Sequence, residues 1–298
     1  MIYDILIVGA GPAGLTAAIY ARRAGKSVLI LEKGTFGGQM TFSPKIENYP
    51  GFPVLSGMEL ADKMVEQALG LGAEIEIDTV LSLEDKGDTK LLHCEGGDFE
   101  GRSVIIATGA KHRLLGVPGE AELIGEGISF CAVCDGAFFE GKEVLVIGGG
   151  NSALQEAALL SQTCRSVIVV QNLAFLTGEK KLQELLFAKD NVDFIYSATV
   201  ERFEKEGETI KTVISTDGKK KELFADGVFV AVGLAPDNEP FKDAVALDHG
   251  YISSGEACTT NCPGVFTAGD CRTKQIRQIA TAISDGAIAA LAACSYIG

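Results

Sequence analysis

The hydrophobic positions at the start of the chain predict a strand, a tight turn, a helix and a second strand. Residues 4–34 read DILIVGAGPAGLTAAIYARRAGKSVLILEKG, in which an apolar run ends in glycines and an alanine-rich stretch follows. A second apolar run then ends at Glu32. Short continuous apolar runs bounded by glycines are typical of buried strands, so we expect a βαβ unit here.

The same order of elements recurs in residues 143–172, which read EVLVIGGGNSALQEAALLSQTCRSVIVVQN. An apolar run, a glycine turn, a helical stretch and a second apolar run again follow one another. The chain has 298 residues, 47% of them hydrophobic, and only 8 prolines. This length is comfortable for two hydrophobic cores, so we predict a compact α/β protein built from two such halves.

Charge and hydropathy limit the partners of this chain. Its formal net charge of −14 argues against general affinity for nucleic acid or anionic membranes, because both depend on clustered Lys and Arg. No stretch approaches the roughly 20 apolar residues that span a bilayer, and we expect the closing GAIAALAAC, residues 286–294, to be a buried helix. We therefore predict a soluble, cytoplasmic protein. Most of the local basic groups are interpreted as solvated surface, namely Lys111–Arg113, Lys219–Lys221 and Arg272–Arg277.

Gly9, Gly11 and Gly14 form a G-x-G-x-x-G pattern between the first strand and its helix. Gly9 and Gly11 let the backbone approach a pyrophosphate, and the N-terminus of the helix stabilises its negative charge. The Glu32 carboxylate, at the end of the second strand, would accept hydrogen bonds from ribose hydroxyls. Because the strand, the helix and the acid are all in place, the pattern predicts a dinucleotide site.

The second glycine turn lacks the matching acid. Gly148 and Gly150 begin its pattern, and Gln171 follows Gly148 at the interval by which Glu32 follows Gly9, since 171 − 148 = 32 − 9 = 23. At this position NAD would need an acid, and NADP would need a nearby Arg for its 2′-phosphate. The predicted fold is therefore complete, but the group that selects the nucleotide is missing.

Two of the eight cysteines, Cys131 and Cys134, form a C-x-x-C pair. Zinc would need two further ligands at matching spacing, and the other cysteines match no common metal or iron–sulfur pattern, so we predict no metal site. The pair is interpreted as a dithiol/disulfide couple, whose thiolate attacks a disulfide through a mixed intermediate. Asp135 follows directly and would relay protons to a leaving thiolate, unless it is only a turn residue before Gly136.

With these motifs in view, the sequence resembles the low-molecular-weight thioredoxin reductases over essentially its whole length. The resemblance rests on an ordered set of short segments rather than on one pattern. They are GAGPAG at 9–14, GGQM at 37–40, IENYPGFP at 46–53, ATGA at 107–110, CAVCDG at 131–136, GGGNSA at 148–153, AVGLAPDN at 231–238, FTAGDCR at 266–272 and IRQIATA at 276–282.

The resemblance implies two Rossmann-like, three-layer ββα dinucleotide-binding domains, the second inserted in the first. The FAD-binding domain would be discontinuous, at 1–113 and 245–298, and the inserted domain at 114–244 would carry the C-x-x-C pair. It also implies a homodimer that reduces thioredoxin, with Asp135 passing protons to the thiolate or the reduced flavin. The residues that it places on FAD are Gly9, Gly11, Pro12, Ala13, Gly14, Glu32, Gly38, Gln39, Asn48, Thr108, Gly109, Asp270, Arg277, Gln278 and Ile279.

The chain departs from the family's NADPH-using members after the second strand of the inserted domain. Those members carry a His-Arg-Arg run with a further Arg, whereas this chain has Gln171-Asn172-Leu173 and no cation before Lys180. An Asp that is usual in the glycine turn is also replaced by Asn151. We therefore predict a vestigial or weak nucleotide site at Gly148, Gly150, Asn151, Ser152 and Gln171.

This departure looks like the ferredoxin-dependent flavin thioredoxin reductases. On that interpretation reduced ferredoxin supplies electrons to FAD, and NADPH or NADH does not. Ferredoxins are usually acidic, as this chain is, so a local basic face at Lys111–Arg113 or Arg272–Arg277 would have to steer their encounter. Three alternatives stay open: an NAD(P)H-dependent reductase in which Lys180 or Lys181 reaches the ribose, a glutaredoxin-like or peroxiredoxin-like partner, and a non-catalytic flavoprotein redox sensor.

Overall fold

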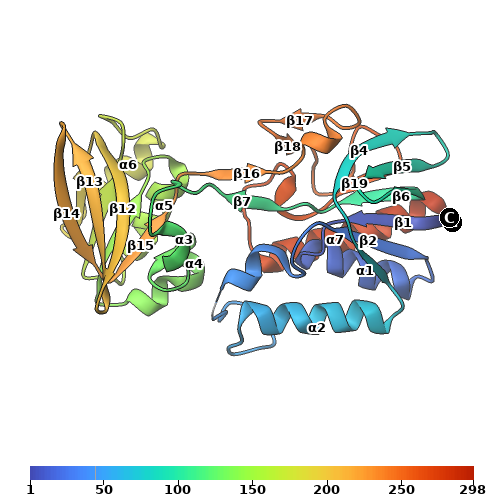
Figure 1. The fold of residues 1–298 in the computed structure, drawn as a ribbon, viewed down its shortest axis with the longest axis horizontal. Helices are drawn as coiled ribbons and strands as arrows, with labels where there is room; N and C mark the ends of the chain where they lie inside the picture. The colour runs from blue at the N-terminus through green and yellow to red at the C-terminus, as the bar shows by residue number, and fades with distance from the viewer. Residues whose placement is uncertain (44) are drawn as a thin grey trace. The chain divides into compact units, whose positions relative to one another are not determined.

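The chain folds into two compact units in a computed structural model that describes residues 1–43 and 45–298. The first unit combines residues 1–111 with 235–298, and the second comprises residues 112–234. Figure 1 labels most of the helices and many of the strands of both units. Each unit contains a sheet built around parallel strands, with a glycine turn after its first βα strand, so the predicted α/β class is confirmed.

The chain passes between the units through two segments that pair with each other, β7 (Ala110–His112) and β16 (Leu234–Pro236). Our sequence boundary after residue 244 differs from this division, because residues 235–244 pack with the first unit. Phe241 is only 1% exposed and shares a hydrophobic cluster with Leu6 and Ile106 of that unit. The compact units therefore divide at 234/235.

The sheet of the first unit has the order β3-β2-β1-β6-β5-β4, and β19 also pairs with β6. β1 lies parallel to β2 and β6, whereas β4 and β5 form an antiparallel hairpin that continues to β6. Residues Ile5–Ile7 of β1 are fully buried, which explains their continuous apolar pattern. The strands are β1 Ile2–Val8, β2 Val28–Glu32, β3 Glu74–Ile77, β4 Val80–Asp85, β5 Lys90–Cys94, β6 Asp98–Ile106 and β19 Val265–Thr267, with a separate pair β17 Leu247–Asp248 and β18 Tyr251–Ile252.

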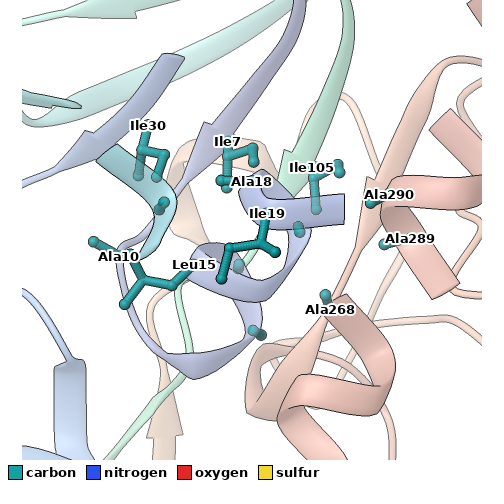
Figure 2. Packing of buried hydrophobic residues seen from close by; sticks show 14 of the residues in the cluster. Ile7, Ala10, Leu15, Ala18, Ile19, Ile30, Ile105, Ala268, Ala289 and Ala290 are labelled. Atoms are coloured by element: carbon teal, nitrogen blue, oxygen red, sulfur yellow. The ribbon is translucent and has the colours of Figure 1, made fainter. Parts of the chain in front are cut away.

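Helices α1 (Pro12–Arg23) and α7 (Ile279–Ile297) pack against each other in the core of this unit. Figure 2 shows Ile7 and Ile105 of the sheet with Leu15 of α1 and the small side chains of α7. At Gly286 a Cβ atom would lie 2.2 Å from the Ala13 carbonyl oxygen, so the two helix backbones touch there. The remaining helical segments of the unit are α2 Gly57–Gly70, η1 Gly38–Phe42, η3 Glu239–Phe241 and η4 Gly269–Cys271.

Helix α7 is long and apolar enough, by length and composition, to cross a membrane, which we did not expect from the sequence. Its 19 residues pass this test because alanine and isoleucine dominate them and Asp285 is the one charged residue. One face of the helix nevertheless lies against α1, with Ala289, Ala290 and Ala293 fully buried. The structure therefore uses α7 as a core helix.

Asp285 forms a buried ionic cluster between α7 and the turn that follows β19. Its carboxylate accepts two hydrogen bonds from Arg272, at 2.9 and 2.8 Å, and one from Lys274 at 2.9 Å. It also accepts the backbone N–H of Gly269 at 3.0 Å. Arg272 and Lys274 are thus not solvated surface cations as predicted, because they neutralise a buried carboxylate.

The second unit contains a parallel sheet of order β11-β10-β9-β15-β8 and a three-stranded antiparallel sheet of order β12-β13-β14. Helix α5 (Asn151–Leu160) follows β9 through the second glycine turn, as the repeated pattern predicts. The other elements are β8 Ile128–Ser129, β9 Glu143–Ile147, β10 Ser166–Val170, β11 Val192–Ile195, β12 Ala198–Glu206, β13 Thr209–Thr216, β14 Lys219–Ala225, β15 Gly227–Val230, α3 Glu120–Leu123, α4 Ala132–Asp135, η2 Gly136–Phe139 and α6 Lys180–Phe187.

We predict that Asp285→Ala lowers the free energy of unfolding by about 3–5 kcal/mol, because it leaves the buried Arg272 and Lys274 without their partner. Burial opposes ionisation of Asp285, but these two cations outweigh it and lower its pKa. The stabilisation is therefore present above the carboxyl's unfolded pKa and is lost as pH falls through the folded pKa. Urea unfolding at several pH values measures both effects.

Glu239→Ala is the matched control for this substitution. Glu239 pairs with Lys242 on the surface, where both side chains are more than half exposed. Its loss should change the unfolding free energy by no more than about 1 kcal/mol. Equal effects of the two substitutions would show that the Asp285 cluster is no structural anchor.

Candidate dinucleotide and dithiol sites

The first glycine turn brings three segments of backbone into contact. Gly9 has φ +107°, and a Cβ there would lie 2.4 Å from the Ala107 carbonyl oxygen. A Cβ at Gly14 would lie 1.9 Å from the carbonyl oxygen of Gly9. Nothing lies within 4 Å of the Cβ position at Gly11, which leaves an open cradle there. Glycine is thus needed for packing at two positions and leaves space for a ligand at the third.

The open cradle at Gly11 lies at the N-terminus of α1. Pro12 is the first helical residue, no side chain caps this end, and the first turn carries no acid. Gly38 of η1 approaches from the other side, since its Cβ would lie 3.4 Å from the Gly11 Cα atom. A helix N-terminus with uncapped N–H groups suits a pyrophosphate.

Glu32 lies at the carboxyl end of β2, beside the glycine turn. Its Oε2 accepts the Ala10 N–H at 2.7 Å, and its Oε1 accepts the Gly34 N–H at 2.9 Å. These two hydrogen bonds fix the carboxylate, and each oxygen keeps a lone pair for a further donor. A pocket lined by Glu32, Gly9 and Thr108 opens here, so the position fits the ribose contact that we predicted.

Asp270 lies in η4, directly after β19, where the Asp285 cluster holds Gly269 and Arg272 on either side. Its Oδ1 atom is buried and has no hydrogen-bond partner among the residues that the structure describes. Burial raises the pKa of this carboxyl. An unpaired buried oxygen calls for a donor from outside the protein, and a hydroxyl of a bound cofactor would supply one.

Of the other residues predicted to lie near the flavin, Asn48 and Gln278 contact each other, and the rest lie at separate positions. The Asn48 amide donates to Gln278 Oε1 at 3.2 Å, and the Arg277 guanidinium lies 4.5 Å from the centre of the Tyr251 ring. Gln278 caps α7, so Ile279 is its first residue. Gln39 is exposed, Gly109 has φ +70°, and Ala13 packs beneath Gly286.

Asn238 is a residue of this region whose role the sequence analysis missed. It is 1% exposed, accepts a hydrogen bond from Thr108 Oγ1 at 2.9 Å, and donates to the Gly250 and Cys271 carbonyls at 2.9 and 2.8 Å. It therefore ties the turn after β6 to the segment around Asp270. The segment AVGLAPDN drew attention to its position, but only the fold reveals these partners.

In the second unit, Cys131 and Cys134 form a disulfide, with Cα atoms 5.3 Å apart. Both cysteines are half-buried, and Val133 between them is 55% exposed. Cys131 caps the short helix α4, since its Sγ accepts the Cys134 N–H at 3.1 Å. The disulfide thus lies at the surface of its unit, where thiol–disulfide exchange is sterically possible.

Asp135 closes α4 and points into the unit. Its Oδ2 accepts the Ser129 hydroxyl at 2.6 Å, while its Oδ1 is buried with no partner among the described residues. Burial raises the pKa of Asp135, and the Ser129 hydrogen bond opposes this shift. Ser129 also accepts the Cys131 N–H at 3.1 Å, so it links the carboxyl to the first cysteine.

The structure describes no group of three or more His, Cys, Asp or Glu side chains suited to hold a metal ion among residues 1–43 and 45–298. The other cysteines are separate thiols, and five of the six are buried. Cys271 is fully buried, and burial raises its pKa. Burial also raises the pKa of Cys258 to about 11.

The second glycine turn has the same backbone packing as the first. A Cβ at Gly148, where φ is +132°, would lie 2.5 Å from the Ala231 carbonyl oxygen. Gly150 precedes α5 without a capping side chain, and Asn151 and Ser152 begin that helix as exposed residues. The turn is therefore structurally complete.

The segment 171–179 folds back onto this turn. The Gln171 side chain is 4% exposed, and its Cδ would lie 2.5 Å from a Cβ at Gly149. The N–H groups of Thr177 and Gly178 donate to the Gly149 carbonyl at 2.8 and 3.0 Å. Glu179 donates its N–H to Asn151 Oδ1 at 2.7 Å and accepts the Asn151 amide at 3.3 Å. A nucleotide at this turn would thus meet an amide and a carboxylate.

Two glycine turns of the dinucleotide-binding type together with a surface disulfide are the features of a two-unit disulfide oxidoreductase. The pyridine nucleotide-disulphide oxidoreductase family matches residues 3–286. A thioredoxin reductase of Listeria monocytogenes is 43% identical over 99% of this chain and 94% of its own length. A protein described as a 34.2 kDa protein in the rubredoxin operon of Clostridium pasteurianum is 44% identical over 99% and 97%. The crystal structure of thioredoxin reductase from Streptococcus pyogenes matches with a TM-score of 0.94 and 43% identity, covering 99% of this chain and 98% of that one.

The chain belongs to the low-molecular-weight thioredoxin reductase family. The family predicted from the motifs is thereby confirmed. The names of these relatives specify no electron donor, and the family description favours a pyridine nucleotide over the ferredoxin that we predicted. The ferredoxin-dependent branch stays a prediction.

We predict that iodoacetamide labels the reduced Cys131–Cys134 pair well before the buried thiols. Only the thiolate reacts, and a thiol of pKa 11 holds roughly one part in a thousand as thiolate at pH 8. After reduction of the folded protein, peptide mass spectrometry should find early label at Cys131 or Cys134 and very slow label at Cys258 and Cys271. Labelling in guanidinium, where all eight cysteines should react alike, is the control. Fast labelling of Cys271 in the folded protein would contradict the prediction that burial keeps its thiol protonated and slow to react.

Proposed function

We propose that this protein is an FAD-dependent thioredoxin-disulfide reductase, in which the Cys131–Cys134 couple passes electrons to thioredoxin. The observation that carries the proposal is the half-buried disulfide followed in sequence by Asp135, whose Oδ1 is buried without a partner among the described residues and whose Oδ2 is linked through Ser129 to Cys131. Relatives named thioredoxin reductase over nearly the whole chain support the same activity. Thioredoxin is the protein substrate, and we expect the enzyme to act in the cytoplasm as a homodimer.

FAD would bind to the first unit, residues 1–111 and 235–298. The uncapped N-terminus of α1 with Gly11 would hold its pyrophosphate, and Glu32 its ribose. Asp270 would accept from the ribityl chain, and Asn48 with Gln278 would lie near the flavin ring. Bound FAD supplies the electron pair that opens the disulfide, and it links one-electron and two-electron chemistry.

The dithiol then reduces thioredoxin by two exchanges. One thiolate attacks the thioredoxin disulfide, a mixed disulfide forms, and one thioredoxin sulfur leaves and takes up a proton. The second enzyme thiol loses its proton and attacks the mixed disulfide, which restores the Cys131–Cys134 bond and releases the second thioredoxin thiol. Asp135 would move these protons, because it is linked through Ser129 to the Cys131 backbone and adjoins Cys134 in sequence.

For the electron donor we propose reduced ferredoxin. Segment 171–179 carries no cation, places Gln171 over Gly149 and brings the Glu179 carboxylate to the start of α5. Each Arg that binds a 2′-phosphate contributes on the order of 1.5–3 kcal/mol, so the absence of two or three would weaken NADPH binding by several orders of magnitude. Lys111 and Arg113 are exposed and would serve to steer an acidic partner.

A nicotinamide nucleotide is the second candidate donor. The family description names pyridine nucleotides, and the second glycine turn keeps its backbone geometry at Gly148 and Gly150. Lys180 and Lys181 are exposed at the start of α6 and are the nearest cations along the chain. They would have to bind the ribose or its phosphate after segment 171–179 moves.

An anaerobic flavin absorbance experiment separates the two donors. We expect photoreduced ferredoxin to bleach the flavin band and oxidised thioredoxin to restore it, while NADPH and NADH at millimolar concentration leave the band unchanged on a catalytic timescale. Rapid bleaching by either nucleotide would contradict the ferredoxin proposal. Failure of thioredoxin to reoxidise a bleached enzyme would contradict thioredoxin reduction itself. A Cys131→Ser, Cys134→Ser double variant should still bleach but not reduce thioredoxin.

We also predict that Asp270→Ala weakens FAD binding by about tenfold to a hundredfold, because a hydrogen bond to a charged group contributes about 1.5–3 kcal/mol. The same change removes a buried oxygen that has no partner in the described apoprotein, so it should not lower the stability of the FAD-free protein. The flavin-to-protein absorbance ratio after dialysis measures the first effect, and urea unfolding of the apoprotein the second. Asp243→Ala, an exposed change in the same unit, is the control.

A further inference from the structure

The backbone between the two cysteines contacts a second carboxyl, which our sequence analysis did not consider. Ala132 lies between Cys131 and Cys134, and its N–H donates to Glu156 Oε2. Glu156 belongs to α5, and α4 packs directly against that helix. The side chain thus reaches the redox couple from a rigid element that is remote from it in the sequence.

Glu156 and Asp135 approach the couple from two helices and interact with each other. Burial raises the pKa of Glu156 to about 7, the repulsion from Asp135 acts in the same direction, and the Ala132 N–H opposes both. The buried Asp135 Oδ1 has no hydrogen-bond partner among the described residues. It can therefore accept a hydrogen bond when the carboxyl is ionised and donate one when it is protonated. Both carboxyls therefore reach the backbone around the couple, Glu156 at Ala132 and Asp135 through Ser129 at Cys131.

Among the described residues, Asp135 is the one charged group that shifts the Glu156 pKa. The elements that pack most extensively against α5 are α4, α6, β9 and β10, and β10 contains no charged residue. The charged residues of β9 and α6 are exposed, and none of them shifts the Glu156 pKa. These residues are Glu143, Lys180, Lys181 and Glu184.

We propose that Glu156 is a positioning residue that fixes the turn between the two cysteines and, together with Asp135, exchanges protons with this couple. The pair is a proton store for dithiol/disulfide exchange at Cys131–Cys134. The inference rests on the proposed dithiol chemistry, but it depends neither on thioredoxin as the substrate nor on the electron donor.

The proton balance of each exchange follows from this arrangement. In the first exchange one enzyme thiol gives its proton to the carboxyl pair and attacks the substrate disulfide; one S–S bond forms, another breaks, and the departing sulfur takes that proton from the pair. In the second exchange the other enzyme thiol gives its proton to the pair and attacks the mixed disulfide, which restores the enzyme disulfide, and the second product sulfur departs and takes that proton from the pair. Over both steps the two protons of the enzyme dithiol pass to the product dithiol, and the carboxyl pair ends as it began.

Glu156→Gln tests this role, because the Gln side-chain oxygen still accepts the Ala132 N–H but cannot hold the proton. The probe is oxidised glutathione, added to the FAD-loaded protein after reduction with dithiothreitol, from about pH 5.5 to pH 8.5. In the unaltered protein, the plot of exchange rate against pH should show an inflection near pH 7, in addition to the one caused by ionisation of the thiols. In Glu156→Gln the inflection should vanish, and the rate near pH 6 should fall about tenfold or more.

Infrared difference spectroscopy on the oxidised protein gives a readout that does not depend on turnover. The unaltered protein should lose a protonated-carboxyl band as pH rises through about 7, and Glu156→Gln should lack that band. Asp135→Asn removes the repulsion between the carboxyls and should move the remaining Glu156 titration to lower pH. Glu156→Ala also removes the Ala132 contact, so the difference between the Ala and Gln variants measures the positional part.

Superimposable pH profiles for Glu156→Gln and the unaltered protein would overturn the proposal. So would an unchanged carboxyl band in either carboxyl variant. If the inflection is present but thioredoxin is not reduced, the proton store stands and only the proposed substrate fails.

Discussion

The carboxylate of Asp285 is the interaction on which the first unit depends. It lies on the only long apolar helix of the described chain, yet it accepts hydrogen bonds from Arg272, Lys274 and the Gly269 backbone. A buried charge must be neutralised and hydrogen-bonded, so this single residue joins α7 to the turn after β19. That turn carries Asp270, whose buried Oδ1 has no hydrogen-bond partner among the described residues. The helix packing and the candidate flavin site are therefore parts of one arrangement.

Asp135 and Glu156 in the second unit lie in a different electrostatic environment from that of Asp285. Asp135 and Glu156 are half-buried and have no cation partner in the described part of the chain, so burial raises the pKa of both carboxyls, and the Asp135 charge adds to the shift at Glu156. Asp285 instead contacts Arg272 and Lys274, and these two cations stabilise its ionised form. The same side-chain chemistry thus anchors structure in one unit and is available for proton transfer in the other, because the surrounding charges differ.

The two glycine turns share one backbone conformation but differ in the side chains around it. At Gly9 and Gly148 the chain leaves the strand in the same left-handed conformation and touches a neighbouring strand's carbonyl. At the first turn Glu32 and an open cradle remain available to a ligand. At the second, Gln171 and the segment up to Glu179 use their hydrogen bonds within the protein. Backbone packing preserves the turn, whereas ligand binding depends on a few side chains that can change without loss of the fold.

The sequence by itself determined both βα turns, the glycine positions, Glu32, the Cys131–Cys134 couple and the absent cations after Gln171. These features are local, since they depend on residue type, spacing and period along the chain. Only the tertiary structure decided that Arg272 and Lys274 are internal, that Asn238 joins two loops, that residues 235–244 pack with the first unit and that Glu156 reaches Ala132. Each of these contacts joins segments that are separated along the chain. Their energies depend on burial and on the partner across the fold, and neither is encoded in the spacing of neighbouring residues.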